Sequence, residues 1–352
     1  MTKQIQIAAL VPYKIFPAKM GGQKAVALFY NYIGALLPVT IISVKNNEFP
    51  QQFNAKFIAA LDNSILRYVN PFLFFRIKKI LRENKATHFI IEHPYFGWLG
   101  ILLQWFLPVC LVVRSHNIEA FRFKSIGKWW WKILWHYEKY THQYAGLNFF
   151  ITEEDRLFAI KEFKLEPKKC HTITYGFESL QKPSAEQINS TKITLQQKHS
   201  ITVDEKILLF NGTLNYKPNQ EALNIILHQL NPLLLAQKTF SYKIIICGKN
   251  LPESFAQLKD NGVANIIYAG FVEDVSIYFE GADIFINPVT TGGGIKTKLI
   301  EALGANLSCV STASGAEGIP AEITGGKLIV VPDNNWQAFA AAIETIDIKK
   351  NT

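Results

Sequence analysis

The chain alternates short apolar runs with longer stretches of helical periodicity. The runs are rich in β-branched and aromatic residues and are bounded by Gly, Asn or Pro. They cover residues 6–12, 39–44, 88–93, 108–117, 146–152 and 171–176, and then 206–212, 242–248, 265–270, 282–288, 307–312 and 327–331. This alternation predicts an α/β protein with parallel sheets covered by helices, and two such series in tandem predict two Rossmann-like domains.

The predicted domain boundary lies in residues 178–200, which are polar and poor in core side chains. We therefore expect an N-terminal domain over residues 1–180 and a C-terminal domain over residues 200–335. Residues 336–352 form a terminal helical pattern that could cross back onto the first domain.

One apolar run, residues 96–113, nearly reaches the length of a membrane span. Pro108 divides it, Gln104 interrupts it, and its β-branched end precedes Arg114. We interpret it as a buried helix followed by a strand. The N-terminal residues have no long apolar segment and are typical of a first strand rather than of a signal peptide.

A glycine-rich segment separates the predicted strand at 282–288 from a helical pattern that starts near Lys296. A strand, a glycine turn and a helix start together make an anion site, because backbone N–H groups point outward and glycine lets a phosphate come close. Lys296 can add a mobile positive charge, and Glu301 could accept hydrogen bonds from ribose hydroxyls. The candidate donor-binding residues of this segment are Gly292, Gly293, Gly294, Ile295, Lys296 and Glu301.

Residues 292–319 resemble the C-terminal motif of the retaining glycosyltransferase family 4 (GT-B glycosyltransferases, group 1). The resemblance implies a GT-B fold, in which two Rossmann-like domains with parallel sheets face each other across a cleft. The family commonly carries two glutamates eight positions apart; Glu301 matches the second, and Gly293 occupies the place of the first. A Gly-x-Gly-Ile-Lys variant occurs in some branches of the family.

Other segments that resemble family loops supply further candidates. Gly212 ends the run at 206–212 and Lys217 follows it; this segment resembles a loop that binds the donor phosphates, although the usual arginine is absent. Residues Gly270, Phe271 and Val272 resemble a loop near the nucleotide base. The pair Gly21 and Gly22 resembles an N-terminal loop that approaches the acceptor or the donor phosphate. Each of these segments is also compatible with a plain turn at the end of a strand.

Two histidines lie at the ends of successive strand-like runs, where active-site groups of open α/β sheets collect. The resemblance implies that His116 contacts the donor sugar and orients the reacting centre. His93 is the second catalytic candidate, and Glu92 could orient either ring or pair with Arg114. A lone histidine is more often structural, so the pairing carries the hypothesis.

Charge and aromatic residues are unevenly divided. Residues 1–180 hold 23 Lys and Arg against 12 Asp and Glu, a balance of +11, and the remaining 14 against 16 give −2, which together make the net +9 of the chain. Residues 121–140 combine Trp129, Trp130, Trp131 and Trp135 with lysines. This combination favours an anionic membrane surface as a partner, or else a helix with its aromatic side chains in the core. Nucleic acid is not expected, because no recognition module accompanies the charge.

The four cysteines lack metal-ligand spacing, and three of them lie in apolar runs. They are typical of reduced core thiols, which favours a cytoplasmic protein, peripheral to the inner face of the membrane if residues 121–140 are exposed. We expect no metal and no cofactor, since lysine and helix N-termini can offset the charge of a diphosphate.

The sequence thus predicts a hexosyltransferase-like glycosyltransferase that moves a sugar from a nucleotide-sugar to a saccharide or lipid-linked acceptor in surface polysaccharide biosynthesis. Two alternatives remain open: a GT-B nucleotide-sugar epimerase or hydrolase, and a non-catalytic nucleotide-sugar-binding protein. The missing first glutamate is compatible with the last of these.

Overall fold

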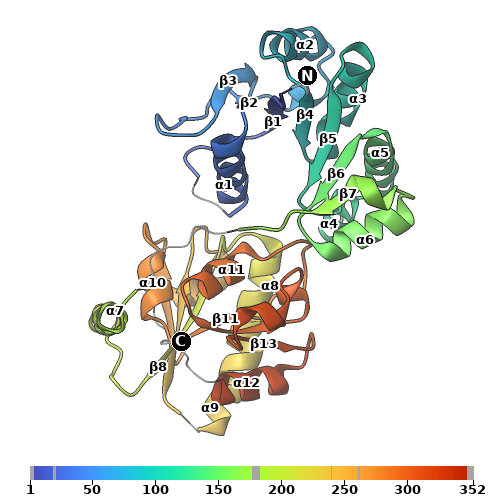
Figure 1. Cartoon of the computed structure of the whole chain (residues 1–352). Helices are drawn as coiled ribbons and strands as arrows, with labels where there is room; N and C mark the ends of the chain where they lie inside the picture. The colour runs from blue at the N-terminus through green and yellow to red at the C-terminus, as the bar shows by residue number, and fades with distance from the viewer. Residues whose placement is uncertain (1–3, 19–20, 177–182, 239, 261, 347–352) are drawn as a thin grey trace. The chain divides into compact units, whose positions relative to one another are not determined.

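The computed structural model describes residues 4–18, 21–176, 183–238, 240–260 and 262–346 (Figure 1). The chain forms two compact units, Met1–Gly176 and Phe177–Thr352. Each is built around its own parallel sheet and its own apolar core. The predicted α/β class and the two Rossmann-like domains are confirmed.

Unit 1 contains a seven-stranded sheet with the order β3-β2-β1-β4-β5-β6-β7. Every pairing of neighbouring strands in it is parallel. Its strands are β1 (Ile7–Leu10), β2 (Val39–Val44), β3 (Lys56–Leu61), β4 (His88–Glu92), β5 (Cys110–Ser115), β6 (Leu147–Phe150) and β7 (Cys170–Thr172). The strand pairs β1–β2 and β1–β4 form the centre of the sheet and are almost wholly buried, which explains their continuous apolar sequence.

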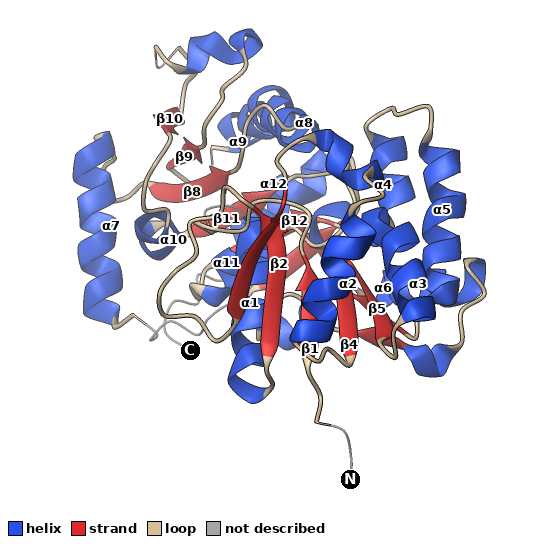
Figure 2. Ribbon diagram, turned by 90° about the horizontal axis from the view of Figure 1, so that it is seen from above, coloured by secondary structure: helices blue, strands red, loops and turns tan. Residues whose placement is uncertain are grey.

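Helices cover both faces of this sheet (Figure 2). The helices of unit 1 are α1 (Gly21–Leu36), α2 (Leu73–Glu83), α3 (Gly97–Phe106), α4 (Glu119–Ser125), α5 (Trp131–Tyr144) and α6 (Glu153–Glu162), with short helical turns η1 (Ile65–Val69), η2 (Pro94–Phe96) and η3 (Pro167–Lys169). Helix α1 buries Val26 and Tyr30 against one face, whereas α2 and α3 bury Ile77 and Leu99 against the other.

Unit 2 repeats the architecture with a six-stranded parallel sheet of order β10-β9-β8-β11-β12-β13. Its strands are β8 (Lys206–Asn211), β9 (Tyr242–Cys247), β10 (Ile266–Gly270), β11 (Ile284–Asn287), β12 (Ser308–Thr312) and β13 (Leu328–Val331). Its helices are α7 (Ala185–His199), α8 (Lys217–Ile225), which continues through a π-helical turn η4 (Ile226–Leu230) into α9 (Asn231–Gln237), then α10 (Ser276–Gly281), α11 (Thr297–Gly304) and α12 (Trp336–Thr345), with short turns η5 (Glu253–Leu258), η6 (Ser314–Ala316) and η7 (Ala321–Thr324).

The segment predicted as a polar linker, residues 178–200, is in large part a helix. Helix α7 begins with a capping box, in which the Ser184 hydroxyl accepts a hydrogen bond from the backbone N–H of Gln187 and the Gln187 side-chain oxygen accepts one from the backbone N–H of Ser184. It packs along α10 and buries Leu195 in the core of unit 2. Residues 177–182, where the two units join, lie outside the described residues.

The terminal helix belongs to unit 2. Phe339 and Ile343 of α12 are fully buried in the core formed with β8, β9 and β12. A crossing of the terminal segment onto the first domain stays a prediction, and residues 347–352 lie outside the described part of the chain.

Most predicted elements are confirmed, with two corrections. Strand β3 was not predicted, because its first four side chains are exposed or half-buried and it lacks a continuous apolar run. Residues 121–140 do not form one helix: α4 ends at Ser125, and Gly127, with φ of 78°, turns the chain before α5 begins. Residues 97–115 form a helix and then a strand, as expected, and among the described residues no helix is long and apolar enough to cross a membrane.

The strand orders create one topological switch point in each unit. In unit 1 the order reverses between β1 and β4, and in unit 2 between β8 and β11. Ligands of open α/β sheets bind outside the carboxyl ends of the strands at such points. The loops after β1, β4, β8 and β11 are therefore the places to look for a functional site.

We expect Gly34→Ala to lower the free energy of unfolding by about 1–3 kcal/mol, the usual cost of overpacking. A Cβ at this position of α1 would lie 1.8 Å from the backbone oxygen of Asn54. Helix propensity alone predicts the opposite sign, a gain of about 1 kcal/mol. The matched control is Gly22→Ala in the same helix, where a Cβ meets nothing within 4 Å. Urea unfolding of both variants tests this, and equal stability of the two would contradict it.

Candidate active site

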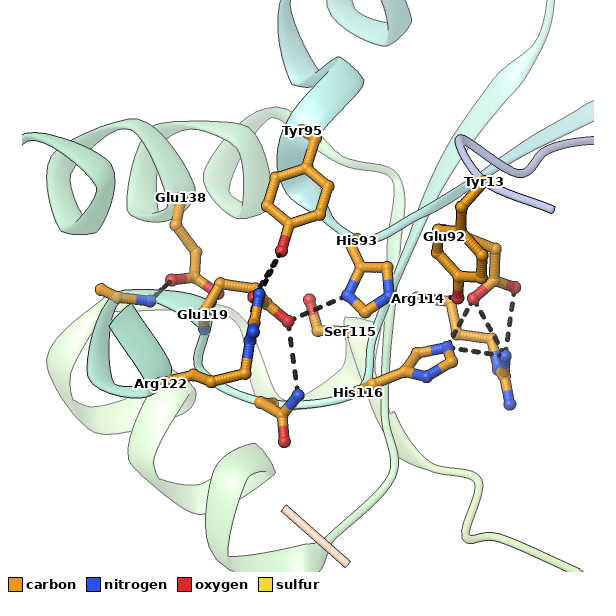
Figure 3. Close-up of polar contacts among 12 residues, drawn as sticks. Tyr13, Glu92, His93, Tyr95, Arg114, Ser115, His116, Glu119, Arg122 and Glu138 are labelled. Carbon is orange, nitrogen blue, oxygen red and sulfur yellow. Dashed lines mark hydrogen bonds and ion pairs between the residues drawn. The ribbon is translucent and has the colours of Figure 1, made fainter. Parts of the chain in front are cut away.

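The carboxyl edge of the unit 1 sheet carries a buried network of charged and aromatic side chains (Figure 3). Its members come from the carboxyl ends of β4 and β5, from the loops after β1, β4 and β5, and from helices α1, α4 and α5. They fall into two groups, one around Glu92 and one around Glu119, and the rings of His93 and His116 lie between them, with centroids 4.4 Å apart.

Glu92 is fully buried and holds three partners. It accepts two hydrogen bonds from Nη1 of Arg114, at 3.0 and 3.1 Å, and one of 2.6 Å from the hydroxyl of Tyr30 on α1. The third partner is Nε2 of His116, 2.6 Å from Oε2. Burial raises the pKa of Glu92, but Arg114 and His116 outweigh it and hold the pKa well below its usual range. The carboxyl is therefore an anion at neutral pH.

The tautomer of His116 follows from this contact. Nε2 lies 2.6 Å from the carboxylate and 3.1 Å from Nη1 of Arg114. An ionised carboxylate can only accept, so Nε2 must carry the proton and donate to Glu92. Burial, helped by the charges of His93 and Arg114, lowers the pKa of His116 to about 4. The ring is neutral at pH 7, and its Nδ1 keeps a lone pair that can accept a hydrogen bond from a sugar hydroxyl.

Arg114 is the largest fully buried side chain of the chain's described part. Its guanidinium lies 3.9 Å above the ring of Phe29 on α1, and its Nε has no hydrogen-bond partner among the described residues. Breaking a buried ion pair by removing one partner typically costs about 3–5 kcal/mol, because an uncompensated charge remains. The Glu92–Arg114 pair thus holds α1 on the sheet and orients His116.

His93 is held in a strained backbone conformation. Its φ and ψ are 62° and 160°, a region that only glycine enters readily and that costs about 1–3 kcal/mol for other residues. The Nδ1 atom lies 3.0 Å from Oε1 of Glu119, and Nε2 lies 3.3 Å from the hydroxyl of Tyr13. The ring stacks on Tyr95. Strain of this kind persists where surrounding contacts over-determine it, as at ligand sites.

Glu119 organises the second group. It accepts hydrogen bonds from Nε of Arg122 at 2.8 Å and from the hydroxyl of Tyr95 at 2.5 Å, and Arg122 also donates to that hydroxyl. Burial raises the pKa of Glu119, but its contacts with His93 and Arg122 outweigh burial and hold the pKa well below its usual range.

A third buried carboxyl, that of Glu138 on α5, lies next to the group around Glu119 (Figure 3). It accepts hydrogen bonds from the backbone N–H groups of Glu119 and Ala120 at 2.9 and 3.0 Å, at the start of α4. Those bonds favour its anion, but burial and the neighbouring Glu119 outweigh them and raise the pKa of Glu138 to about 8.

The glycine loop of unit 2 has the predicted form. Strand β11 runs into residues 288–296, and α11 begins at Thr297, so Lys296 is the N-cap residue rather than part of the first turn. Gly292 and Gly294 have φ of 83° and 74°, which other residues rarely adopt. The Lys296 ammonium donates to the backbone oxygens of these two glycines at 2.8 and 2.7 Å and lies 3.7 Å from Glu317.

The loop after β8 lies against this glycine loop. A Cβ at Gly292 would come within 2.9 Å of the ring of Pro218, so Lys217 and Pro218 at the start of α8 border the glycines. Asn211, the last residue of β8, is buried, and its Oδ1 has no hydrogen-bond partner among the described residues. Gly212 leaves room for the amide of Asn219, which a Cβ would approach to 2.6 Å.

The other predicted donor residues occupy separate positions of unit 2. Glu301 faces Lys298 one turn along α11, with 2.6 Å between Oε2 and Nζ. Gly270, with φ of 71°, ends β10, and the neighbouring Phe271 is exposed while Val272 packs against the core. The strand order puts β10 three places from β11, so the residues at 270–272 lie along the same edge but away from the glycine loop.

The glycine pair of unit 1 starts helix α1. Gly21 is its buried first residue, and Gly22 has open space beside its Cα. Residues 19 and 20 lie outside the description.

Sequence reasoning found His93, His116, Glu92 and Arg114 but missed the group around Glu119. Glu119 stands within the polar run that follows β5, residues 115–119, and this run was the available signal. The sequence does not distinguish Tyr13, Tyr30 and Tyr95 from ordinary core aromatics. Their hydrogen bonds to His93, Glu92 and Glu119 form only in the folded chain. No group of three or more His, Cys, Asp or Glu side chains in the described ranges could hold a metal ion.

Comparison with known proteins points to one class. Residues 205–346 match the family model described as "Glycosyl transferases group 1", which covers most of unit 2 and none of unit 1. Over 271 residues the chain is 24% identical to chitobiosyldiphosphodolichol beta-mannosyltransferase of Debaryomyces hansenii. That match covers 70% of this chain and 57% of the relative, so the chain spans little more than half of the relative's length.

Solved structures match over nearly the whole chain. Anabaena HepE in complex with UDP superposes with a TM-score of 0.70 at 15% identity, covering 98% of this chain and 92% of that one. WaaG, a glycosyltransferase involved in lipopolysaccharide biosynthesis, gives 0.67 at 15% identity over 97% and 90%. These likenesses show the fold: the chain has the two Rossmann-like domains of the GT-B class.

We expect the free energy of unfolding to be greatest near pH 6.5 and to fall on both sides. Burial lowers the pKa of His116 and of His142 from 6.5 to about 4, so the unfolded chain takes up their protons first as the pH falls, and stability declines. The raised pKa of Glu138 acts in reverse: above 4.5 the unfolded chain has lost a proton that the folded chain keeps up to about pH 8. Between 4.5 and 6.5 the two histidines outweigh the single carboxyl.

Urea unfolding at about pH 5, 6.5 and 8 measures this profile. The Glu138→Gln variant should remove the decline above pH 6.5 while leaving the decline in acid. An unchanged alkaline decline in that variant would show that another group causes it.

Proposed function

We propose that this chain is a glycosyltransferase that moves a sugar from a nucleotide-sugar donor to a saccharide or lipid-linked acceptor in the biosynthesis of a surface glycan. The observation that carries the proposal is the glycine loop at the β8–β11 switch point, where Lys296 and the start of α8 border the same backbone turn. The match of residues 205–346 to glycosyl transferases group 1, and UDP in a protein of the same fold, support it.

In this proposal the donor diphosphate lies at the start of α11. Backbone N–H groups of the glycine loop and the helix dipole favour its negative charge, and the Lys296 ammonium offsets it. Lys217 adds a second cation, and Glu301 accepts hydrogen bonds from the ribose hydroxyls. The Gly270–Val272 loop packs near the base. Asn211, whose Oδ1 is buried without a partner, is available to a donor group that enters at the end of β8.

We further propose that transfer proceeds with retention, as in glycosyltransferase family 4. The acceptor oxygen bonds to the anomeric carbon on the face from which the diphosphate leaves, and the acceptor proton passes to the departing phosphate oxygen. Such a reaction needs positioning and charge stabilisation rather than a protein nucleophile. The neutral His116 supplies a fixed acceptor atom for a sugar hydroxyl, and His93 stands beside it.

A second candidate is a nucleotide-sugar-binding protein without transfer activity. Gly293 occupies the position at which the family commonly has a glutamate, and glycine brings no side chain to the donor. Slow hydrolysis of the donor in the absence of acceptor would favour the enzyme, and tight binding without turnover would favour the binding protein. Epimerase activity would appear as a changed donor rather than a freed nucleotide.

We also propose that the protein is cytoplasmic and meets an anionic membrane through residues 121–140. Trp129 is among the most exposed apolar side chains of the chain, and Lys128 and Lys132 beside it are exposed as well. Trp135, in contrast, packs on Phe163 within unit 1, so only part of the aromatic segment is available to a membrane.

The donor site is tested by Lys296→Ala. This variant should weaken nucleotide binding by about 1.5–3 kcal/mol, the worth of a well-formed charge-assisted hydrogen bond. A thermal-shift screen of UDP, GDP, ADP and their sugars first identifies the base, and calorimetry then compares the variant with Glu301→Ala. Exposed Lys259→Ala is the control that removes a lysine elsewhere in unit 2. Unchanged affinity in both Lys296→Ala and Glu301→Ala would rule out the assignment.

The role of His116 is tested by His116→Ala, which should lower turnover by about 10²–10³-fold, the loss typical of a positioned catalytic hydrogen bond. Nucleotide affinity should change far less, because no donor phosphate is assigned to this residue. The control is His171→Ala, which removes an exposed ring on β7. Near-normal turnover with the true acceptor would exclude His116 and direct attention to His93.

A further inference from the structure

A second exposed apolar surface lies outside residues 121–140, on helices α2 and α3 of unit 1. Its side chains are 59–77% exposed, which is unusual for large apolar residues in one neighbourhood. They come from η1, from the first turn of α2 and from the last residues of α3. We call this surface the η1–α2–α3 patch; it consists of Ile65, Leu66, Val69, Phe72, Phe75, Trp105 and Phe106.

Contacts within unit 1 bring the parts of the patch on α2 and α3 together. The rings of Phe74 on α2 and Phe106 on α3 pack edge to face, with centroids 5.4 Å apart. The exposed Phe75 packs on Phe74, with centroids 5.3 Å apart, and the exposed Trp105 directly precedes Phe106 in α3. Figure 1 shows α2 and α3 as neighbours. The opposite face of α2 buries Leu73, Ile77, Ile80 and Leu81 in the core. The exposed Phe72 and Phe75 take no part in that core.

Positive charge surrounds the patch. Residues 62–85 contain six Lys and Arg against two Asp and Glu, a balance of +4. Both acids are already paired: Asp62 lies 2.5 Å from Lys45, and Glu83 lies 3.8 Å from Lys79. Arg76 and Arg82 are exposed on α2, and the Lys78 ammonium lies about 5 Å above the rings of Phe74 and Phe106. Lysine that packs along aromatic rings with its charge at the rim is typical of side chains at a lipid interface.

The charge argues against a second copy of this chain as the occupant. A two-fold dimer through the patch would place the same excess of +4 on both sides of one interface. Aromatic side chains ringed by cations instead complement the apolar interior and anionic headgroups of a membrane surface.

We propose that the η1–α2–α3 patch inserts into the headgroup region of an anionic bilayer. It borders the predicted membrane segment, because α3 packs on α5 and the side-chain amide of Gln104 donates to the backbone oxygen of Tyr144 at 3.0 Å. The inference rests on the proposed function only in that a lipid-linked acceptor lies at such a membrane; the patch does not depend on the sugar chemistry.

The test is flotation of the full chain with vesicles of phosphatidylcholine alone and of phosphatidylcholine mixed with phosphatidylglycerol. Wild-type protein should float with the anionic vesicles, and rising salt should release it, since ionic strength screens the attraction. The double variant Phe72→Ser with Phe75→Ser should lower the partition coefficient about tenfold or more, because two aromatic rings no longer enter the interface. Arg76→Gln with Lys79→Gln should lower it to a similar degree on anionic vesicles alone.

The comparison variant is Trp129→Ser with Ile133→Ser, which removes a similarly exposed aromatic and an aliphatic side chain from the segment at 121–140. A loss confined to this comparison variant would overturn the proposal and leave residues 121–140 as the membrane contact. Wild-type binding that is absent at low salt would overturn it too, as would a wild-type dimer that the serine variant converts to monomer.

If the serine variant unfolds at lower temperature, the glutamine variant and the salt series still decide the question. Nucleotide affinity, measured in parallel, should be equal in all these variants. If the wild type bound no nucleotide, the proposed sugar transfer would be contradicted, but the membrane inference would not be affected.

Discussion

The buried ion pair between Glu92 and Arg114 is the constraint on which the carboxyl edge of unit 1 depends. Two charges removed from water cost several kcal/mol each, and only close geometry with further hydrogen bonds offsets that cost. Here Tyr30 and His116 supply those bonds, and the ring of Phe29 covers the guanidinium. The same contacts seat α1 on the sheet and leave His116 with one tautomer. One set of contacts therefore both stabilises the packing of α1 and fixes the orientation and tautomer of His116.

The two units present different kinds of polar groups at the carboxyl edges of their sheets. Unit 1 gathers side-chain charges in a buried network, in which Glu92 faces Arg114 and Glu119 faces Arg122. Unit 2 presents mostly backbone, with glycines at positive φ and the start of a helix. A network of the first kind can orient a neutral polyol with fixed acceptors and donors. A loop of the second kind suits an anion, because many weak N–H dipoles meet it at once.

The fold class, the two sheets and the glycine loop followed from the sequence, because buried parallel strands and a strand–glycine–helix turn have strong local signatures. Strand β3 and helix α7 did not follow. The first is half-exposed, and the second has a weak apolar stripe whose only clear mark is the box from Ser184 to Gln187. At the site, His93 and His116 were found because they end apolar runs. Glu119, Tyr13 and Tyr30 were not, since their roles depend on contacts between residues 26 to 80 positions apart.

Lys296 has a consequence for how a ligand would enter unit 2. Its ammonium already spans the carbonyl oxygens of Gly292 and Gly294, as a bound cation would. The Lys296 ammonium thus holds the glycine loop in its conformation without a bound anion. In the proposed function, a diphosphate would meet a loop whose conformational entropy is already reduced, and less of its binding energy would be consumed in ordering that loop. Through these two hydrogen bonds Lys296 fixes the conformation of the loop as well as its charge. Arginine has a planar guanidinium instead of a compact ammonium, so it would not replace the lysine equivalently.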